Sequence, residues 1–245
     1  MRAAVLLLFA FTTSLAALAQ QRFDLKVRED MFAGMDGDPV AFDRAMKLIA
    51  DTLAREPDHA EALVWRGDGR LFMAGQAFQR GDFAGGQKLF TEGLADMERA
   101  VALAPNDLRL WRNLGSALYW APGERPKSEP AFKKVVELAE AEIKINPRQP
   151  ALLAQLASAH SMLGSRAETV AAATAVERLG AADAETAYTV ASAYEQIGDR
   201  AAALNWLQQS IAKGYSRDLI DRSPSLAELR KDPRYRTLVD KAVAR

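Results

Sequence analysis

Cysteine is absent from this chain of 245 residues. Its absence excludes disulfide bonds, thiolate metal sites, cysteine nucleophiles and a lipid-modified N-terminal cysteine. Histidine is scarce, with only His59 and His160 present, too few for an ordinary histidine-based metal site. The 32 basic residues balance the 32 acidic ones, and no basic run occurs, whereas nucleic-acid-binding proteins cluster Lys and Arg. We therefore expect no nucleic-acid partner, no metal and no other cofactor.

Long apolar runs are also missing, except at the N-terminus. Arg2 precedes an apolar run from Ala3 to Leu18, and Ala17-Leu18-Ala19 fits the small-x-small cleavage rule. The alternative is an uncleaved anchor, but the run is short for a bilayer span, which needs about 20 apolar residues. We expect residues 1–19 to be a signal peptide cleaved after Ala19, which leaves a periplasmic or secreted protein with no stable membrane insertion.

Catalytic motifs are lacking as well. The segment from Gly81 to Lys88 is only superficially similar to a phosphate-binding loop, because Gln87 follows the last glycine and no strand precedes it. His59-Ala60-Glu61 lacks the paired cysteines of zinc deaminases. We expect His59 at the start of a helix with Asp58 as its N-cap, and His160 packed between apolar neighbours. No catalytic residue is nominated.

The residues that are present favour helix nearly throughout, since Ala, Leu, Glu, Lys, Arg and Gln dominate. Asp38-Pro39 predicts a helix start with an N-cap and a proline in the first turn. From there an apolar stripe recurs at helical spacing: Phe42, Ala45, Met46, Ile49 and Leu53. This helix is expected to end at Glu56-Pro57.

A repeating pattern follows. Each of four chain breaks precedes a small residue by ten positions: Pro57 and Gly67, Pro105 and Gly115, Pro147 and Ala157, Ala181 and Ala191. The intervals between the breaks are 48, 42 and 34 residues. A small residue in the middle of a helix allows a neighbouring helix to approach closely. The pattern predicts stacked helix pairs.

Residues 60–215 resemble the tetratricopeptide repeat (TPR) family, in an exported bacterial form. The segment 184–215 is similar to one repeat through Ala191, Tyr194, the turn at Gly198-Asp199, Ala203 and Leu207. Residues 106–119 match the first helix of a repeat, with Trp111, Leu114 and Gly115 in the family's Trp, Leu and Gly positions. Residues 150–181 match more loosely.

The resemblance implies an all-α fold, a right-handed superhelix (α-solenoid) of antiparallel helix pairs. The expected divisions are an N-terminal segment and first helix (20–57), the repeats (58–215) and capping helices (216–245). The first two units exceed the family period by 14 and 8 residues, which predicts extended helices, a loop at residues 121–126 and irregular stacking. The cap is expected to use Leu226, Leu229, Tyr235, Leu238 and Val239.

The resemblance also implies a concave groove lined by the first helix of each pair. The partner-binding residues carried over are Arg109, Arg112, Ser116, Tyr119, Trp120, Ser158, Ser161, Tyr188, Ser192 and Glu195. Arginine suits a partner carboxylate, and aromatic side chains suit an anchor. A solvated surface, or packing beneath the 121–126 loop, is the alternative reading of these residues.

The implied function is a non-catalytic scaffold of the cell envelope or exterior that binds a protein or peptide partner. Two alternatives stay open. One is a structural subunit of an envelope assembly, and the other is an enzyme whose site lies in residues 75–130.

Overall fold

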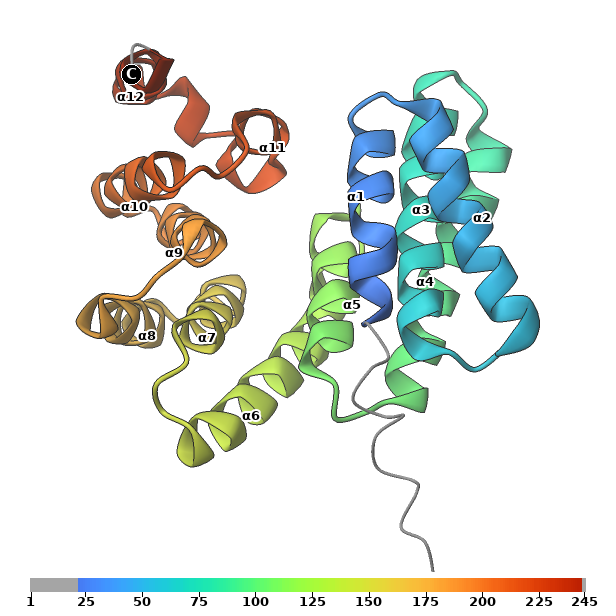
Figure 1. Cartoon of the computed structure of the whole chain (residues 1–245), viewed down its shortest axis with the longest axis horizontal. Coiled ribbons are helices and arrows are strands. Elements are labelled where there is room, and N and C mark those ends of the chain that lie inside the picture. The colour runs from blue at the N-terminus through green and yellow to red at the C-terminus, as the bar shows by residue number, and fades with distance from the viewer. Residues whose placement is uncertain (1–21, 244–245) are drawn as a thin grey trace, which may run out of the picture.

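A computed structural model describes residues 22–243, so the expected signal peptide lies outside the described residues. These residues form α-helices and short 3₁₀ helices, with no strand among them (Figure 1). The α-helices are α1 (Phe23–Met35), α2 (Pro39–Arg55), α3 (Ala60–Gln79), α4 (Phe83–Leu103), α5 (Leu108–Trp120), α6 (Glu129–Ile145), α7 (Pro150–Met162), α8 (Arg166–Leu179), α9 (Ala184–Gln196), α10 (Arg200–Ala212), α11 (Arg217–Arg222) and α12 (Pro233–Val243). The 3₁₀ helices are η1 (Arg125–Ser128), η2 (Pro224–Leu226) and η3 (Leu229–Lys231). Within residues 22–243 no helix is both long and apolar enough to cross a membrane.

Consecutive helices pack against one another as pairs, α1 with α2, α3 with α4, α5 with α6, α7 with α8 and α9 with α10. The pairs follow one another in a curved array, so the predicted helical solenoid is confirmed (Figure 1). Helix α6 packs on both α5 and α7 and links two groups, here called the N-terminal half (α1–α5) and the C-terminal half (α7–α12).

Local signals explain several helix boundaries. The Asp38 carboxylate accepts hydrogen bonds from the backbone N–H groups of Val40 (3.0 Å) and Ala41 (3.1 Å), which confirms the predicted N-cap. At the next pair the prediction was wrong in one detail. His59, not Asp58, caps α3, because its Nδ1 accepts from the N–H of Ala62 at 3.2 Å, while Asp58 forms an ion pair with Arg99.

The helix pairs touch at their small residues, as the repeat pattern predicts. A Cβ added at Gly67 would lie 2.8 Å from the carbonyl oxygen of Gly93, so α3 and α4 cross glycine to glycine. A Cβ at Gly115 would lie 3.1 Å from the Phe132 ring of α6. Ala157 and Ala191 are completely buried. Close approach at these positions lets the backbones of paired helices pack tightly.

The two repeat units that exceed the family period contain the extended helices and the loop that the sequence predicts. Helices α3 and α4 have 20 and 21 residues, against 13 residues in each of α9 and α10. Helix α5 ends at Trp120, and a turn and η1 lead into α6. The extension makes the α3/α4 pair longer than the pairs that follow, so the solenoid is irregular at this end (Figure 1).

The buried residues form two large cores and one small one. The first core joins α1 to α5, and the second joins α7 to α12. A small core of Tyr119, Phe132, Val135 and Ala159 lies where α5, α6 and α7 meet. Of the predicted cap residues, Leu226 and Leu229 are completely buried, Tyr235 is nearly so and Leu238 packs against the second core. The side chain of Val239 is outside the described part.

Candidate functional site

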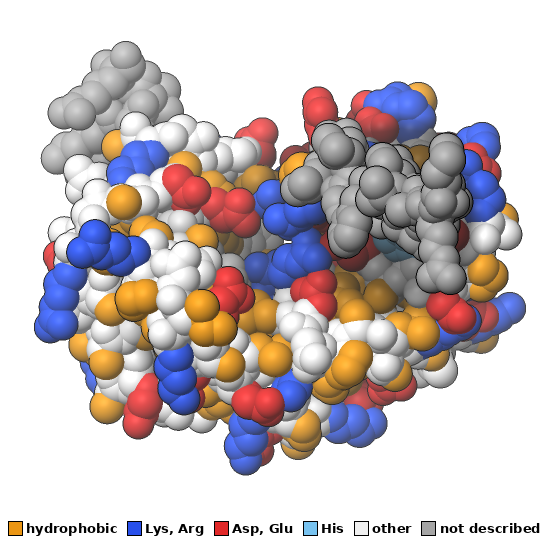
Figure 2. Space-filling model, turned by 60° about the horizontal axis from the view of Figure 1, so that its bottom comes forward, with side chains coloured by type: hydrophobic (Ala, Val, Ile, Leu, Met, Phe, Trp, Pro, Cys, Tyr) orange, Lys and Arg blue, Asp and Glu red, His pale blue; other side chains and the backbone are white. Residues whose placement is uncertain are grey.

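A groove of about 1170 Å³ lies between the two halves. It is lined by residues of α1, α3, α5, α6, α7 and α9, and the surface is visibly hollowed there (Figure 2). Charged side chains of both signs gather at the hollow. Because the first helices of the pairs, α3, α5, α7 and α9, all contribute, this is the concave side of the solenoid.

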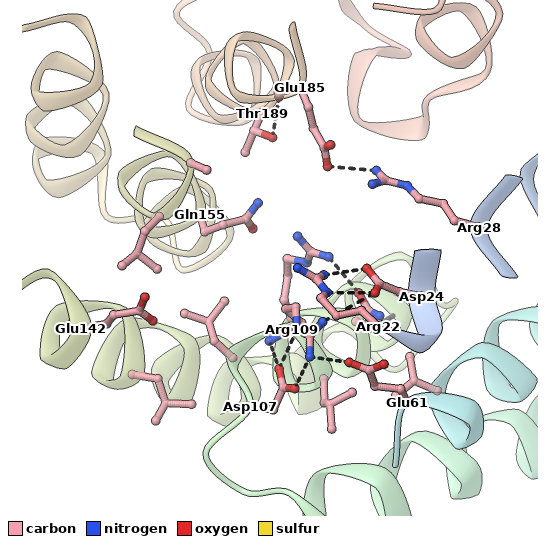
Figure 3. A pocket seen from close by; sticks show the side chains of 18 of the residues that line it. Arg22, Asp24, Arg28, Glu61, Asp107, Arg109, Glu142, Gln155, Glu185 and Thr189 are labelled. Carbon is pink, nitrogen blue, oxygen red and sulfur yellow. Dashed lines mark hydrogen bonds and ion pairs between the residues drawn. The ribbon is translucent and has the colours of Figure 1, made fainter. Parts of the chain in front are cut away.

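Arg109 organises one wall of the groove (Figure 3). Its guanidinium donates to the carboxylates of Asp107 (2.6 Å) and Glu61 (2.5 Å), and Asp24 lies 3.9 Å away. Asp107 also caps α5 by accepting from the backbone N–H of Arg109 at 2.9 Å. Burial acts to raise the pKa of Asp107, but its hydrogen bonds with Arg109 lower it overall. Arg109 therefore joins α1, α3 and α5, and its charge is already neutralised.

Most groove carboxylates have such structural roles. Asp183 caps α9 by accepting from the N–H of Thr186 at 2.7 Å. Glu185 lies in the first turn of α9 and pairs with Arg28 at 3.1 Å. Acidic residues at helix N-termini are favoured by the positive end of the helix dipole. The acids therefore stabilise the helix starts that converge on the groove.

Arg112 differs from Arg109. Its only side-chain hydrogen bond within the described part of the chain goes to the Asn113 amide oxygen, at 3.4 Å, and no carboxylate lies within ion-pair distance. Burial lowers the pKa of Arg112, and the charges of Glu185 and Asp68 act against that effect. A guanidinium stays charged over the physiological range. Arg112 thus presents to the groove a positive charge that has no ion-pair partner among the described residues.

Asp68 of α3 is its counterpart. Among the described residues it has no hydrogen-bond or ion-pair partner, although it is half-buried in the groove wall. Burial raises the pKa of Asp68 to about 7, and the Arg112 charge opposes this rise. A carboxyl group with such a pKa exchanges its proton near neutral pH. The groove therefore contains one unpaired cation and one carboxyl poised to ionise.

Apolar side chains complete the lining. Leu25 of α1 is 52% exposed and Ile145 of α6 is 86% exposed, and both line the groove. Trp65, Leu108 and Leu138 extend the apolar surface between them. Gln155 of α7 and Glu142 of α6 point toward the open space (Figure 3). Exposed apolar residues that share a hollow with polar groups are typical of binding sites.

The structure brings Arg109 and Arg112 into the groove but places the other predicted residues elsewhere. Tyr119 is 5% exposed and is hydrogen-bonded to Arg125 and Gln196. It borders a smaller cavity of about 510 Å³ instead. Ser116 and Trp120 belong to the same C-terminal part of α5 and do not line the groove.

The predicted residues of α7 and α9 are also outside the groove lining. Ser161 and Glu195 are buried, and Ser158 contributes its carbonyl oxygen to a hydrogen bond from Ser161. Tyr188 stacks on Tyr215, with ring centroids 4.4 Å apart, and donates to Ser223 at 2.6 Å. Ser192 accepts from Ser225 at 3.3 Å. The C-terminal segment thus covers the face of α9 that the resemblance assigns to a partner.

The difference has a simple geometric cause. The groove is built from the N-terminal turns of α5, α7 and α9. The partner-binding residues that the TPR resemblance implies lie mostly nearer the C-terminal ends of these helices. Sequence reasoning also missed α1, which supplies Asp24, Arg28 and Phe32. These three residues share one helix face at intervals of four, which is a usable signal.

The segment 75–130, proposed as the alternative enzyme site, contains one buried carboxylate that is fully used. Asp96 accepts hydrogen bonds from Arg66 at 2.6 and 2.7 Å and from Arg70. These contacts tie α4 to α3. Within residues 22–243 no three His, Cys, Asp or Glu side chains are arranged to hold a metal ion.

No protein-family model matches the sequence, and no curated protein matches it either. Solved structures with a similar arrangement include a thermophilic TPR protein of Thermus thermophilus, 20% identical, with 91% of this chain and 99% of that one covered and a TM-score of 0.49. MamA is 17% identical, with 71% and 90% covered and a TM-score of 0.38. PilW, described as a type IV pilus biogenesis factor, is 15% identical, with 81% and 96% covered and a TM-score of 0.35.

Proposed function

We propose that this chain is a non-catalytic scaffold that binds a segment of a partner protein in the groove between its halves. The observation that carries the proposal is the combination of Arg112, Asp68 and exposed apolar side chains in one hollow. Arg112 and Asp68 are costly to leave half-buried without a partner, because charged groups lose hydration there. The exposed apolar side chains gain when a ligand removes them from water. A bound peptide with an acidic group and apolar side chains would pair with Arg112 and cover the apolar surface, and its backbone N–H groups would donate to Asp68.

The lining specifies the chemistry of such a peptide. Its carboxylate would pair with Arg112, whose planar guanidinium suits two parallel hydrogen bonds. Its apolar side chains would lie against Leu25, Leu138 and Ile145. Arg109 contributes by shape alone, because Asp107 and Glu61 already hold its guanidinium. The expected ligand is therefore an apolar peptide segment with an acidic group.

The proposed location is the periplasm or the cell exterior. It rests on the signal-peptide pattern of residues 1–19. Mass spectrometry of the chain expressed in a bacterial host with its own N-terminus tests this. A mature protein beginning at Gln20 in the periplasmic or culture fraction supports export, and an intact chain retained in the cytoplasm contradicts it.

The binding test uses a display library of random peptides, selected in parallel on the wild-type chain and on Arg112→Glu. Arg178→Glu is the matched control, since Arg178 is an exposed arginine on α8 that does not line the groove. We expect acidic, apolar peptides that bind Arg112→Glu at least about tenfold more weakly, given the net energy of a hydrogen bond to a charged group. Selected peptides that bind the wild type, Arg112→Glu and Arg178→Glu equally would show that the groove is not the binding site.

A further inference from the structure

The two halves of the molecule share no large core across the mouth of the groove. Buried residues of α1 and α2 belong only to the first core, and those of α9 to α12 only to the second. Continuous packing between the halves runs instead through α6 and the small core around Phe132. In Figure 1, α1 stands opposite α9 and α11, with α6 joining the halves at the base.

Ion pairs span the mouth where the core does not. Arg28 of α1 reaches Glu185 of α9 at 3.1 Å (Figure 3). Arg222 of α11 reaches Asp36, just after α1, at 2.7 Å, and is also 3.5 Å from the carbonyl oxygen of Met35. The hydrogen bond between Gln196 and Tyr119 lies on the other side, near the small core. Side chains at the edge of each half therefore meet through ion pairs and a polar contact with the backbone.

These pairs are well exposed. The side chains of Arg28 and Glu185 are 42% and 53% exposed, and those of Arg222 and Asp36 are 55% and 32% exposed. Exposed ion pairs contribute little net stability, because side-chain ordering and hydration offset the attraction, and salt screens what remains. A contact of this kind closes reversibly, whereas an apolar core would hold the halves together permanently.

We propose that Arg28–Glu185 and Arg222–Asp36 form an electrostatic clasp, and that the C-terminal half swings about the small core to open and close the groove. The opening admits a ligand to a hollow that the clasp otherwise narrows. The proposal concerns the free chain, so it stands or fails independently of any peptide-binding role. Arg28 is placed for the task by Phe32, over whose ring its guanidinium lies at 5.6 Å.

The absence of cysteine makes the test direct. Cysteines introduced at Ala50 of α2 and Gln208 of α10, both exposed and uncharged, accept a fluorophore pair without altering any charge. Single-molecule energy transfer then reports the separation of the halves. We expect a high-transfer population at low salt and a low-transfer population that grows at least about twofold by 1 M NaCl, where the screening length is short.

Charge reversal identifies the contact responsible. Arg28→Glu and Glu185→Arg are each expected to increase the low-transfer population, and the double exchange Arg28→Glu/Glu185→Arg to restore the wild-type distribution. The matched control is Arg44→Glu, which reverses the Arg44–Asp30 pair at 2.6 Å within the N-terminal half. It should leave energy transfer unchanged. Circular dichroism verifies that each variant is folded. If Arg28→Glu is unfolded, energy transfer in Glu185→Arg tests the same ion pair. Single reversals that match the wild type, or a double exchange that fails to restore closure, would overturn the clasp.

Discussion

At the scale of single residues, the groove contains charged groups that are paired within the fold and others that have no ion-pair partner among the described residues. Arg109 is bound by two carboxylates and ties three helices together. Arg112 is one helical turn further along α5 and has only a weak contact with a neutral amide. Asp68 has neither a hydrogen bond nor an ion pair among the described side chains. The position of each arginine on the helix, and not its residue type, therefore decides whether it has an ion-pair partner.

Asp68 gives a prediction for stability against pH. Its pKa is raised from 3.8 to about 7 in the folded chain, so between these values the folded state holds a proton that the unfolded state has released. The contribution of Asp68 to the free energy of unfolding therefore falls across this interval as pH rises, and it levels off above the interval. Asp68→Asn lacks this titration. Urea unfolding at several pH values should show the free energy of unfolding of the variant rising relative to that of the wild type between pH 3.8 and about 7. A difference in free energy that stays constant over this interval would contradict the raised pKa of Asp68.

Gly67 gives a prediction for packing. An added methyl group would lie 2.8 Å from the Gly93 carbonyl oxygen and 2.9 Å from Met97, so Gly67→Ala should lower the free energy of unfolding by about 1–3 kcal/mol, as in other overpacked sites. Gly75 is the control on the same helix, because a methyl group there meets nothing within 4 Å. Gly75→Ala should instead stabilise by up to about 1 kcal/mol through helix propensity. Equal effects in thermal denaturation would refute the close crossing.

At the scale of helices, the elements that carry local signals could be predicted and the others could not. Asp38-Pro39 indicates the start of α2, and the long first unit indicates extended α3 and α4. Helix α1 lacks a capping side chain at Arg22. It is held by burial of Phe23, Val27 and Met31 against later helices, and the spacing of these residues by four is the sequence signal that marks it in place of a cap. The small-residue positions were predictable because closely packed helices require Gly or Ala where their backbones approach each other.

The groove was less predictable than the helices. Its lining comes from α1 and α3 and from the N-terminal turns of α5, α7 and α9, and no local sequence pattern shows which turns of separate helices converge. The residues of α9 carried over from the family pattern are covered by Tyr215, Ser223 and Ser225. Arg109 and Arg112 were carried over from the family pattern with the others, and they line the groove because they lie in the first half of α5.

The C-terminal segment gives a prediction at this scale. Leu229 of η3 is completely buried against the end of the solenoid, so Leu229→Ala should cost about 2–5 kcal/mol of unfolding free energy, as for other buried leucines. Leu103 at the end of α4 is 41% exposed and provides the control, for which a change within about 0.5 kcal/mol is expected. Urea unfolding measures both. A small loss at Leu229 would mean that the segment lies on the repeats without capping them.

At the scale of the whole molecule, two cores joined by α6 leave a hollow that neither core fills. The helix starts of α5, α7 and α9 converge on it, and α1 forms the opposite wall. Each half has its own apolar core, and neither core extends across the groove. The architecture therefore places the stabilising apolar contacts in the two cores and leaves the groove, where we propose binding, outside both.

The most direct test of this account is amide hydrogen exchange, measured with and without a peptide selected on the wild-type chain. Binding in the groove predicts slower exchange in the N-terminal turns of α5, α7 and α9 and in α1, with no change along the outer helices α4, α8 and α10. Protection confined to the outer helices, with the groove exchanging as before, would contradict it.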